Sequence, residues 1–265
     1  MPATKGQNEQ FQKLLDCAPE IADAMRFTVK AELVADDTPL VPGTKLVHFI
    51  RHGDGVHNAA QREWRERPEW DGNSEPYTDD NDPDFKYLDP ELNDLGKEQA
   101  AALQPRSALV KPTLMVVSTL KRATQTGIIA FQDHFDAGLK TVALEECHGT
   151  WRTCDKRCDL TELQEMFPRV DYSNIQFEKD IEWAGGPERN WRFLAMRAVR
   201  FCTWLKSRDE DHVVVATHSA FLLALCNAVL TLPPEERAWF KNAEMRTMRL
   251  TFVDKTTPKR KHASD

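Results

Sequence analysis

The sequence predicts an α/β protein whose mainly parallel central sheet is covered by helices on both faces. Apolar runs at residues 46–50, 114–117 and 213–217 alternate with segments that have helical periodicity. Repeated strand and helix units of this kind are joined by crossovers, which bury both faces of the sheet. Each run also ends on polar residues, and ligands of open α/β sheets bind at the carboxyl ends of strands. We therefore expect a three-layer α/β/α fold with one site at that edge.

The composition is typical of a folded, soluble protein. Of 265 residues, 41% are hydrophobic and 9% aromatic, and the net charge of −7 argues against a general attraction to nucleic acid or membranes. No apolar stretch approaches the ~20 residues that span a bilayer. The first residues, MPATKGQNEQ, lack a signal-peptide pattern, and the six cysteines lack the density of a disulfide scaffold. These features favour a cytoplasmic location.

The chain is divided into a central domain and two flanking segments. Residues 1–43 lack a sustained period and close on a turn-forming run, so we interpret them as a peripheral N-terminal extension. Residues 44–254 form the predicted domain. Residues 255–265 are expected to be a disordered tail.

Within the domain, hydrophobic periodicity and the residues that cap or end helices indicate where the remaining elements lie. Asn93 and Asp94 precede a helical stretch that stops before Pro105, which is the pattern of a capped helix. The run Leu194, Ala198, Phe201 and Leu205 marks one face of another helix. The other expected elements are a loop at 71–87, a helix at 121–135, a strand at 140–144, a long capping excursion at 147–190 and a helix at 220–231.

The residues after the first two strands suit phosphoryl transfer. His52 follows the first strand directly, between Arg51 and Gly53, and Arg122 follows the second. A neutral imidazole nitrogen is a competent phosphoryl acceptor. Arginine is permanently charged and offers a planar fork of donors to phosphate oxygens. A histidine packed at a strand end is the alternative for His52 taken alone.

Two further groups extend this candidate site. His218 ends the third strand and precedes Ser219, where the final apolar helix starts, so a bound phosphate would meet that helix terminus. A protonated His218 would add positive charge in the transition state. Asn58 can donate an amide hydrogen bond to the same anion, and a role as a turn or cap residue is nearly as plausible.

A carboxyl group is expected at a fourth strand end. Glu145 and Glu146 follow the strand at 140–144. A carboxylic acid can protonate a departing alkoxide and then activate water as a carboxylate. Adjacent residues on an extended chain point opposite ways, so only one of the two is expected to face the site.

A zinc site is the less favoured interpretation of a cysteine-rich segment. Sulfur and imidazole ligands suit zinc. The segment lacks the CxxC pair of common zinc motifs, so buried structural cysteines are expected instead. The residues concerned are Cys147, His148, Cys154 and Cys158.

Several strings together resemble the histidine phosphatase superfamily, also called phosphoglycerate mutase-like. They are LVHFIRHGDGVHN, LDPELNDLGKEQA, VVSTLKRATQTG, LEECHGTWRTCDKR and VVVATHSAFLLALCNAV, and they span residues 46–230 in the family's order. The CDKR segment is similar to the phosphoglycerate mutase-like branch of plants and fungi. Thr119 and Ala220 stand where the family often has proline and glycine, and neither change removes a reacting group.

The resemblance implies a role for each candidate residue. It makes His52 the phosphate acceptor, places Arg51, Arg122 and His218 around the phosphate with Asn58 at the rim, and aligns Glu146 with the family's acid. It implies a reaction with no metal or other cofactor, in which phosphohistidine forms and water then releases phosphate. Glu145 is the alternative acid, one register away.

The resemblance implies a phosphoric monoester hydrolase, similar to histidine acid phosphatases, acting on a phosphorylated small molecule. A phosphoprotein is the less favoured substrate. A mutase is the enzymatic alternative, with Arg152, Lys156 and Arg157 as candidates for a second phosphate site. A weakly active phospho-ligand binding protein is the other alternative. We expect no nucleic-acid or membrane partner, and a homodimer is compatible with the sequence.

Overall fold

A computed structural model describes residues 5–184 and 190–255 of the chain. A seven-stranded sheet forms its centre, in the order β4-β3-β5-β2-β7-β1-β6. Neighbouring strands are parallel, except that β7 runs antiparallel to both β1 and β2. The strands are β1 (Phe27–Leu33), β2 (Lys45–Arg51), β3 (Leu114–Ser118), β4 (Thr141–Leu144), β5 (His212–Thr217), β6 (Leu230–Thr231) and β7 (Met245–Asp254).

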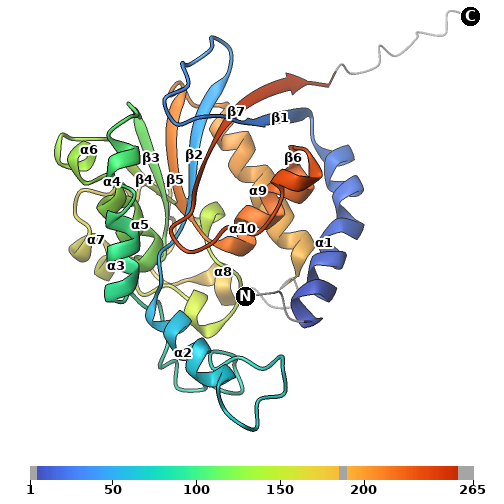
Figure 1. Cartoon of the computed structure of the whole chain (residues 1–265), viewed down its shortest axis with the longest axis vertical. Helices are drawn as coiled ribbons and strands as arrows, with labels where there is room; N and C mark the ends of the chain where they lie inside the picture. The colour runs from blue at the N-terminus through green and yellow to red at the C-terminus, as the bar shows by residue number, and fades with distance from the viewer. Residues whose placement is uncertain (1–4, 185–189, 256–265) are drawn as a thin grey trace, which may run out of the picture.

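Helices cover both faces of the sheet, which confirms the predicted three-layer α/β/α fold (Figure 1). Leu114 and Val116 face a core shared with α1, α9 and α10, whereas Met115 and Val117 face a core on the α5 side. The helices are α1 (Lys5–Ala24), α2 (Val56–Arg65), α3 (Asp94–Ala101), α4 (Gln104–Ser107), α5 (Lys121–Ala130), α6 (Gln132–Asp136), α7 (Leu160–Met166), α8 (Ile181–Ala184), α9 (Trp191–Lys206) and α10 (Ser219–Ala224).

The expectation that residues 1–43 are peripheral is wrong for their described part. Strand β1 pairs with β7 along its whole length, so it is part of the sheet. Helix α1 packs on α9, and its Leu14 and Ile21 side chains are fully buried in the main core. The segment therefore closes one face of the domain. The predicted disordered tail, apart from Lys255, lies outside the described residues.

Helix α3 begins where its cap was predicted, whereas the two helices predicted at 121–135 and 220–231 are each interrupted. The Asn93 side chain accepts a hydrogen bond from the backbone N–H of Gly96, so it caps α3 as predicted. The helix predicted at 121–135 is broken at Phe131 into α5 and α6. In place of the helix predicted at 220–231, the structure has α10, then a π-helix over Leu225–Val229, and then β6.

The loop at 71–87 and the excursion at 147–190 are tied to each other above the sheet edge. Thr153, in a short 3₁₀ helix (Thr153–Asp155), donates its backbone N–H and its hydroxyl to the carbonyl of Tyr77. The same hydroxyl lies 2.5 Å from a carboxylate oxygen of Asp82. These contacts hold both segments over the carboxyl ends of β2, β3 and β5. In the described parts of the chain, no helix has the length and apolar character needed to cross a membrane.

Candidate functional site

The residues predicted at the strand ends meet around one pocket of about 210 Å³. The predicted lining residues are Arg51, His52, Asn58, Arg122, His218 and Ser219. They come from the ends of β2 and β5, from α2 and α5, and from the start of α10. The structure therefore brings together the residues predicted around the first phosphate.

His52 is held with one ring nitrogen available to the pocket. Its Nδ1 lies 2.7 Å from the carbonyl oxygen of Gly53, and a carbonyl can only accept, so Nδ1 carries the proton. The other nitrogen, Nε2, is then the unprotonated one. Burial lowers the pKa of His52 well below its usual value, and the nearby Arg122 and Arg51 guanidinium groups lower it further. The side chain is therefore a neutral imidazole at neutral pH.

Arg51 and Arg122 supply the positive charge of the pocket. Arg51 donates from Nη1 to the carbonyl of Phe240 at 2.9 Å, and Arg122 donates to the carbonyl of Cys154 at 2.8 Å. The Nε atoms of both arginines are buried and have no hydrogen-bond partner among the described residues. Burial lowers the pKa of Arg51 to about 10, which leaves it charged at neutral pH. Two fixed cations with unsatisfied donors are suited to an anion.

His218 lies beside both His52 and Arg122. Its ring centroid is 5.1 Å from that of His52, and its Nδ1 is 3.4 Å from Arg122 Nη2. Its Nε2 is 2.8 Å from the hydroxyl of Ser118 at the end of β3. Burial lowers the pKa of His218 well below its usual value, with a further contribution from Arg122. In the unliganded pocket His218 is therefore neutral at neutral pH, whereas the protonated form expected from the sequence concerns the transition state and stays a prediction.

Asn58 caps a helix and also lines the pocket. Its Oδ1 accepts a hydrogen bond of 3.0 Å from the backbone N–H of Gly55, which caps the start of α2. This contact fixes the oxygen, so the amide NH₂ is the group that can donate to an anion in the pocket. Ser219 lines the pocket as the first residue of α10.

The structure does not bring either predicted acid into the pocket. Neither Glu145 nor Glu146 is among the described residues that line it. Glu145 accepts hydrogen bonds from Thr119 and Arg157, and the Glu146 carboxylate lies 4.0 Å from the guanidinium of Arg200 on α9. Both glutamates belong to a short 3₁₀ helix after β4, which turns their side chains away from the extended path assumed in the sequence argument.

The carboxylates in the pocket are Asp155 and Glu75. Asp155 belongs to the CDKR segment, and its Oδ1 is 2.6 Å from Arg122 Nη2. Glu75 belongs to the loop at 71–87 and lies 2.6 Å from Nε of Arg152. Sequence reasoning missed both residues because they come from segments without periodicity. The CDKR string, quoted for the resemblance, was the one signal that pointed to Asp155.

A third histidine also faces the pocket. His57, on the first turn of α2, has its ring centroid 5.4 Å from that of His52 and 5.8 Å from that of Tyr77. Its Nδ1 is buried and has no hydrogen-bond partner among the described residues. The remaining lining residues that the sequence argument did not predict are Gln61, Asn73, Tyr77, Gly149, Thr150, Cys154, Trp191, Ala220 and Trp239.

The basic residues considered for a second phosphate are dispersed. Arg152 lines the pocket and is paired with Glu75. Arg157 is buried and donates from Nε to Glu145 at 2.9 Å. Lys156 lies over the rings of Phe85 and Trp183. Only Arg152 is therefore positioned to reach a ligand in the pocket.

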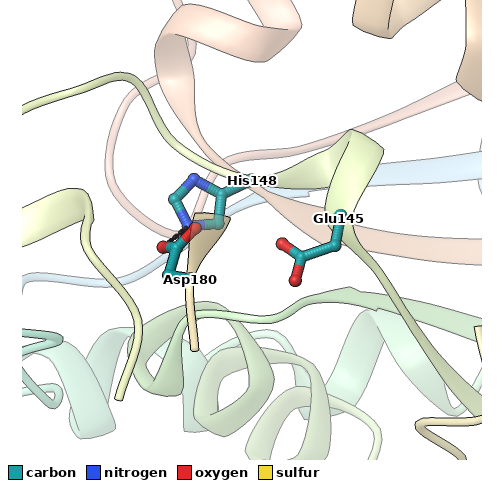
Figure 2. Close-up of side chains that lie close together, drawn as sticks. All are labelled: Glu145, His148 and Asp180. Atoms are coloured by element: carbon teal, nitrogen blue, oxygen red, sulfur yellow. Dashed lines mark ion pairs between the residues drawn. The ribbon is translucent and has the colours of Figure 1, made fainter. Parts of the chain in front are cut away.

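One group of possible metal ligands, Glu145, His148 and Asp180, occurs among the described residues (Figure 2). None of the three lines the pocket. His148 and Asp180 form an ion pair at 3.2 Å, and Glu145 points toward them. Arg157 already neutralises Glu145. Burial opposes the charge of His148, but Asp180 outweighs it and raises the pKa of His148. These contacts are those of a buried ion-pair cluster. The group includes none of the cysteines of the zinc interpretation.

Comparison with known proteins places this geometry in a family. A profile of the histidine phosphatase superfamily (branch 1) matches residues 83–263. That range begins after Arg51 and His52. The assignment of these two residues to the site therefore rests on their sequence motif and on their position in the pocket.

Individual relatives agree with the profile. A phosphoglycerate mutase-like protein of Arabidopsis thaliana is 28% identical over 240 residues, covering 77% of this chain and 83% of that protein. The glucosyl-3-phosphoglycerate phosphatase of Mycolicibacterium vanbaalenii is 28% identical over 155 residues, covering 55% of this chain and 66% of that protein. The solved structure of mycobacterial hydrolase 1 shares the fold, with a TM-score of 0.50 at 19% identity over 80% of this chain and 97% of that chain. Because the profile spans more than half of the sequence, the chain belongs to the histidine phosphatase superfamily.

Proposed function

We propose that the protein is a phosphatase that hydrolyses a phosphomonoester of a small molecule through a phosphohistidine at His52. The observation that carries the proposal is the state of His52, whose Nδ1 proton is bound to the carbonyl of Gly53 while Nε2 is free in a pocket with two arginines. A neutral imidazole in this tautomer is a nucleophile at Nε2. Family membership supports phosphatase or mutase chemistry.

The reaction needs positioning and positive charge around the phosphoryl oxygens. Arg51, at the end of β2, and Arg122, at the start of α5, would bind these oxygens, and Asn58 would donate its amide at the rim. His218 would contribute a donor once an anion is bound beside it, because a dianion favours the protonated ring. None of these roles requires a metal ion.

Hydrolysis is favoured over transfer of the phosphoryl group to a second position. A mutase holds a second phosphate with additional basic residues. Here Arg152 is paired with Glu75, and Arg157 is paired with Glu145 outside the pocket lining. Two of the three candidate cations for a second phosphate are therefore engaged by carboxylates, and the third, Lys156, lies over aromatic rings.

The test is phosphate release by the purified chain in the presence of EDTA. The substrates are p-nitrophenyl phosphate and a panel of phosphorylated metabolites, and the control is His52→Ala. We expect release by the wild type and none above background by the variant. Release that persists in His52→Ala, or that requires an added metal, would overturn the proposal. Conversion of a monophosphate to its positional isomer without release would identify a mutase.

A further inference from the structure

Transfer to His52 leaves an alkoxide that must be protonated, so the pocket needs an acid. The residue aligned with the family's acid, Glu146, has its carboxylate 4.0 Å from Arg200 and is not among the described lining residues. A proton donor has to lie within hydrogen-bond reach of the reacting oxygen. In the unliganded structure Glu146 is not placed to supply the proton, so a carboxyl group that lines the pocket is the better candidate.

Asp155 is the carboxyl group of the pocket that contacts Arg122, one of the two proposed phosphate-binding arginines. Its Oδ1 lies 2.6 Å from Nη2 of Arg122, and the same nitrogen is 3.4 Å from Nδ1 of His218. Its side chain is 9% exposed, and it lines the pocket. One arginine nitrogen therefore joins the carboxyl group to the histidine that stands beside His52.

The surroundings of Asp155 are built to hold it there. The hydroxyl of Thr150 donates to its Oδ2 at 2.5 Å. A Cβ atom on Gly149 would come within 2.2 Å of Oδ1, so the absence of a side chain at 149 makes room for the carboxyl group. Burial raises the pKa of Asp155, but Arg122 and Thr150 outweigh it, and the pKa is below its usual value. Without a ligand the group is a carboxylate.

Glu75 is the competing carboxyl group, and its contacts are different. It lies on the loop at 71–87, its side chain is 17% exposed, and its partner is Arg152 rather than Arg122. Gln61 also donates to it, at 3.3 Å. Within the described parts of the chain, Glu75 forms no hydrogen bond or ion pair with the pocket histidines, with Arg51 or with Arg122. Its position is that of a rim residue.

We propose that Asp155, rather than Glu146, is the proton donor and acceptor of the reaction. The proposal rests on the proposed phosphatase function. A phosphate dianion bound to Arg122 would place its oxygens beside those of Asp155. Anionic oxygens in contact repel each other unless they share a proton, as in a pair of neighbouring carboxylates. Substrate binding therefore supplies the condition under which Asp155 holds a proton.

The two steps then balance. In the first, Nε2 of His52 bonds to phosphorus, the bond between phosphorus and the ester oxygen breaks, and that oxygen takes the proton of Asp155 and leaves as an alcohol. In the second, a water oxygen bonds to phosphorus while Asp155 takes one of its protons. The bond between phosphorus and Nε2 breaks, which releases hydrogen phosphate and restores neutral His52 and protonated Asp155.

The experiment compares Asp155→Asn with Glu146→Gln on two substrates. Asparagine keeps an oxygen that can accept from Arg122 but carries no transferable proton. General acid catalysis contributes ~10²–10⁴-fold, so kcat/KM for an alkyl phosphate such as glycerol 2-phosphate should fall by that factor in Asp155→Asn. For p-nitrophenyl phosphate, whose leaving group needs little protonation, the fall should be at least about tenfold smaller. Glu146→Gln should match Glu165→Gln, a control that removes an exposed charge on α7.

A burst experiment separates chemistry from positioning. Water attack also needs Asp155 in this scheme, so the variant should release about one p-nitrophenolate per chain before the rate falls. Equal losses on both substrates without a burst would show that Asp155 only positions Arg122, and would overturn the proposal. A loss that depends on the leaving group in Glu146→Gln would overturn it as well.

A binding measurement tests the same point without turnover. Calorimetric titration with inorganic phosphate, in two buffers of different ionisation enthalpy, gives the number of protons taken up on binding. The wild type should take up about one proton more than Asp155→Asn. Equal proton uptake by the two proteins would contradict the assignment.

The failure of the proposed function and the failure of the Asp155 role give different results. If His52→Ala retained the wild-type activity, the proposed function would be wrong. If His52→Ala were inactive and Asp155→Asn failed these tests, only the role of Asp155 would be wrong.

Discussion

At the scale of residues, the pocket concentrates neutral imidazoles between fixed cations. His52, His57 and His218 are all buried, and burial is the largest cause of the lowered pKa of each. Arg122 contributes to all three shifts. A protonated histidine would repel the arginines, so an unliganded pocket keeps its rings neutral. An incoming phosphate adds negative charge beside His218, which favours the protonated form of that ring.

The first prediction concerns the pH dependence of kcat/KM, which reports the ionisation of the free enzyme. His52 must be neutral to attack, and its pKa is lowered, so protonation should reduce the rate only well below pH 6.5. The measurement is kcat/KM for p-nitrophenyl phosphate from pH 4 to 8, corrected for ionisation of the substrate. An acid limb centred at or above pH 6.5 would contradict a buried, neutral His52.

The second prediction concerns Arg122→Lys. Lysine keeps a charge but lacks the planar fork of donors that binds Asp155 and the carbonyl of Cys154 from two fixed nitrogen atoms and leaves Nε for a further acceptor. Loss of one preorganised donor typically costs ~10²–10³-fold in rate, so kcat/KM should fall by about that factor. Arg169→Lys, at an exposed arginine paired with Asp136, is the matched control and should have wild-type activity. Similar activity for both variants would rule out a transition-state role for Arg122.

At the scale of elements, the loop after β2 is packed against the first turn of α3, backbone to backbone. A Cβ atom on Gly96 would come within 1.9 Å of the carbonyl oxygen of Asp54, and one on Gly53 would come within 2.5 Å of the carbonyl oxygen of Gly96. The side chain of Asp54 also accepts from Asn93, the cap of α3, and pairs with Arg62 on α2. Two helices therefore fix the loop that carries His52.

The third prediction is that Gly96→Ala weakens both the fold and the activity. The added methyl group meets backbone atoms, which cannot rotate away, so the loop has to shift. Overpacking of this kind costs about 1–3 kcal/mol. A displacement of about 1 Å near a reacting group can cost ~10²-fold in rate. Urea unfolding and kcat/KM measure the two effects, and Leu95→Ala at an exposed position of the same helix is the control. Unchanged values in Gly96→Ala would show that the loop is not held by this contact.

The elements that sequence reasoning missed are those with distant partners. Phe27, Val29, Ala31 and Leu33 alternate with polar residues, which is a strand pattern. Their pairing partner is β7 at the other end of the chain, in the register Phe27 to Asp254. Local pattern shows neither that pairing nor the packing of α1. The strands β2, β3 and β5 were predictable because each is buried on both faces and reads as a continuous apolar run.

The same distinction applies to the candidate site. Arg51, His52, Arg122 and His218 were predictable because they stand at or just beyond the ends of strands or at the start of a helix. Asp155 and Glu75 reach the pocket through loops, and their positions depend on contacts such as Thr153 with Tyr77. Glu146 was expected to point inward on an extended backbone, but the 3₁₀ turn at 145–147 changes its direction.

At the scale of the whole molecule, the buried histidines couple the stability of the fold to pH. Besides those of the pocket, His48 on β2 lies in the core, 2.7 Å from His212 on β5 and 2.8 Å from Thr247 on β7. Burial and then the charge of His212 lower the pKa of His48 to about 3. Protonating these rings therefore requires the fold to accept buried charge or to open. His148 behaves in the opposite sense, because its pKa is raised by its partner Asp180.

The final prediction is loss of stability as the pH falls below about 6.5, the pKa of a histidine in an unfolded chain. A histidine with a lowered pKa in the folded state binds more protons when unfolded, so its contribution is complete above pH 6.5 and decreases as the pH falls toward the folded pKa. Each such group changes the free energy of unfolding by at most about 1.4 kcal/mol per pH unit.

Urea unfolding at intervals between pH 7.5 and 5 should show that the free energy of unfolding rises with pH. The raised pKa of His148 should offset only part of this slope. In His48→Asn the slope should be smaller by up to that amount, whereas substitution of the exposed Lys179 should leave it unchanged. A free energy of unfolding that is constant over this range would show that these histidines titrate in the folded protein as they do in the unfolded chain, which would contradict the lowered pKa of His52.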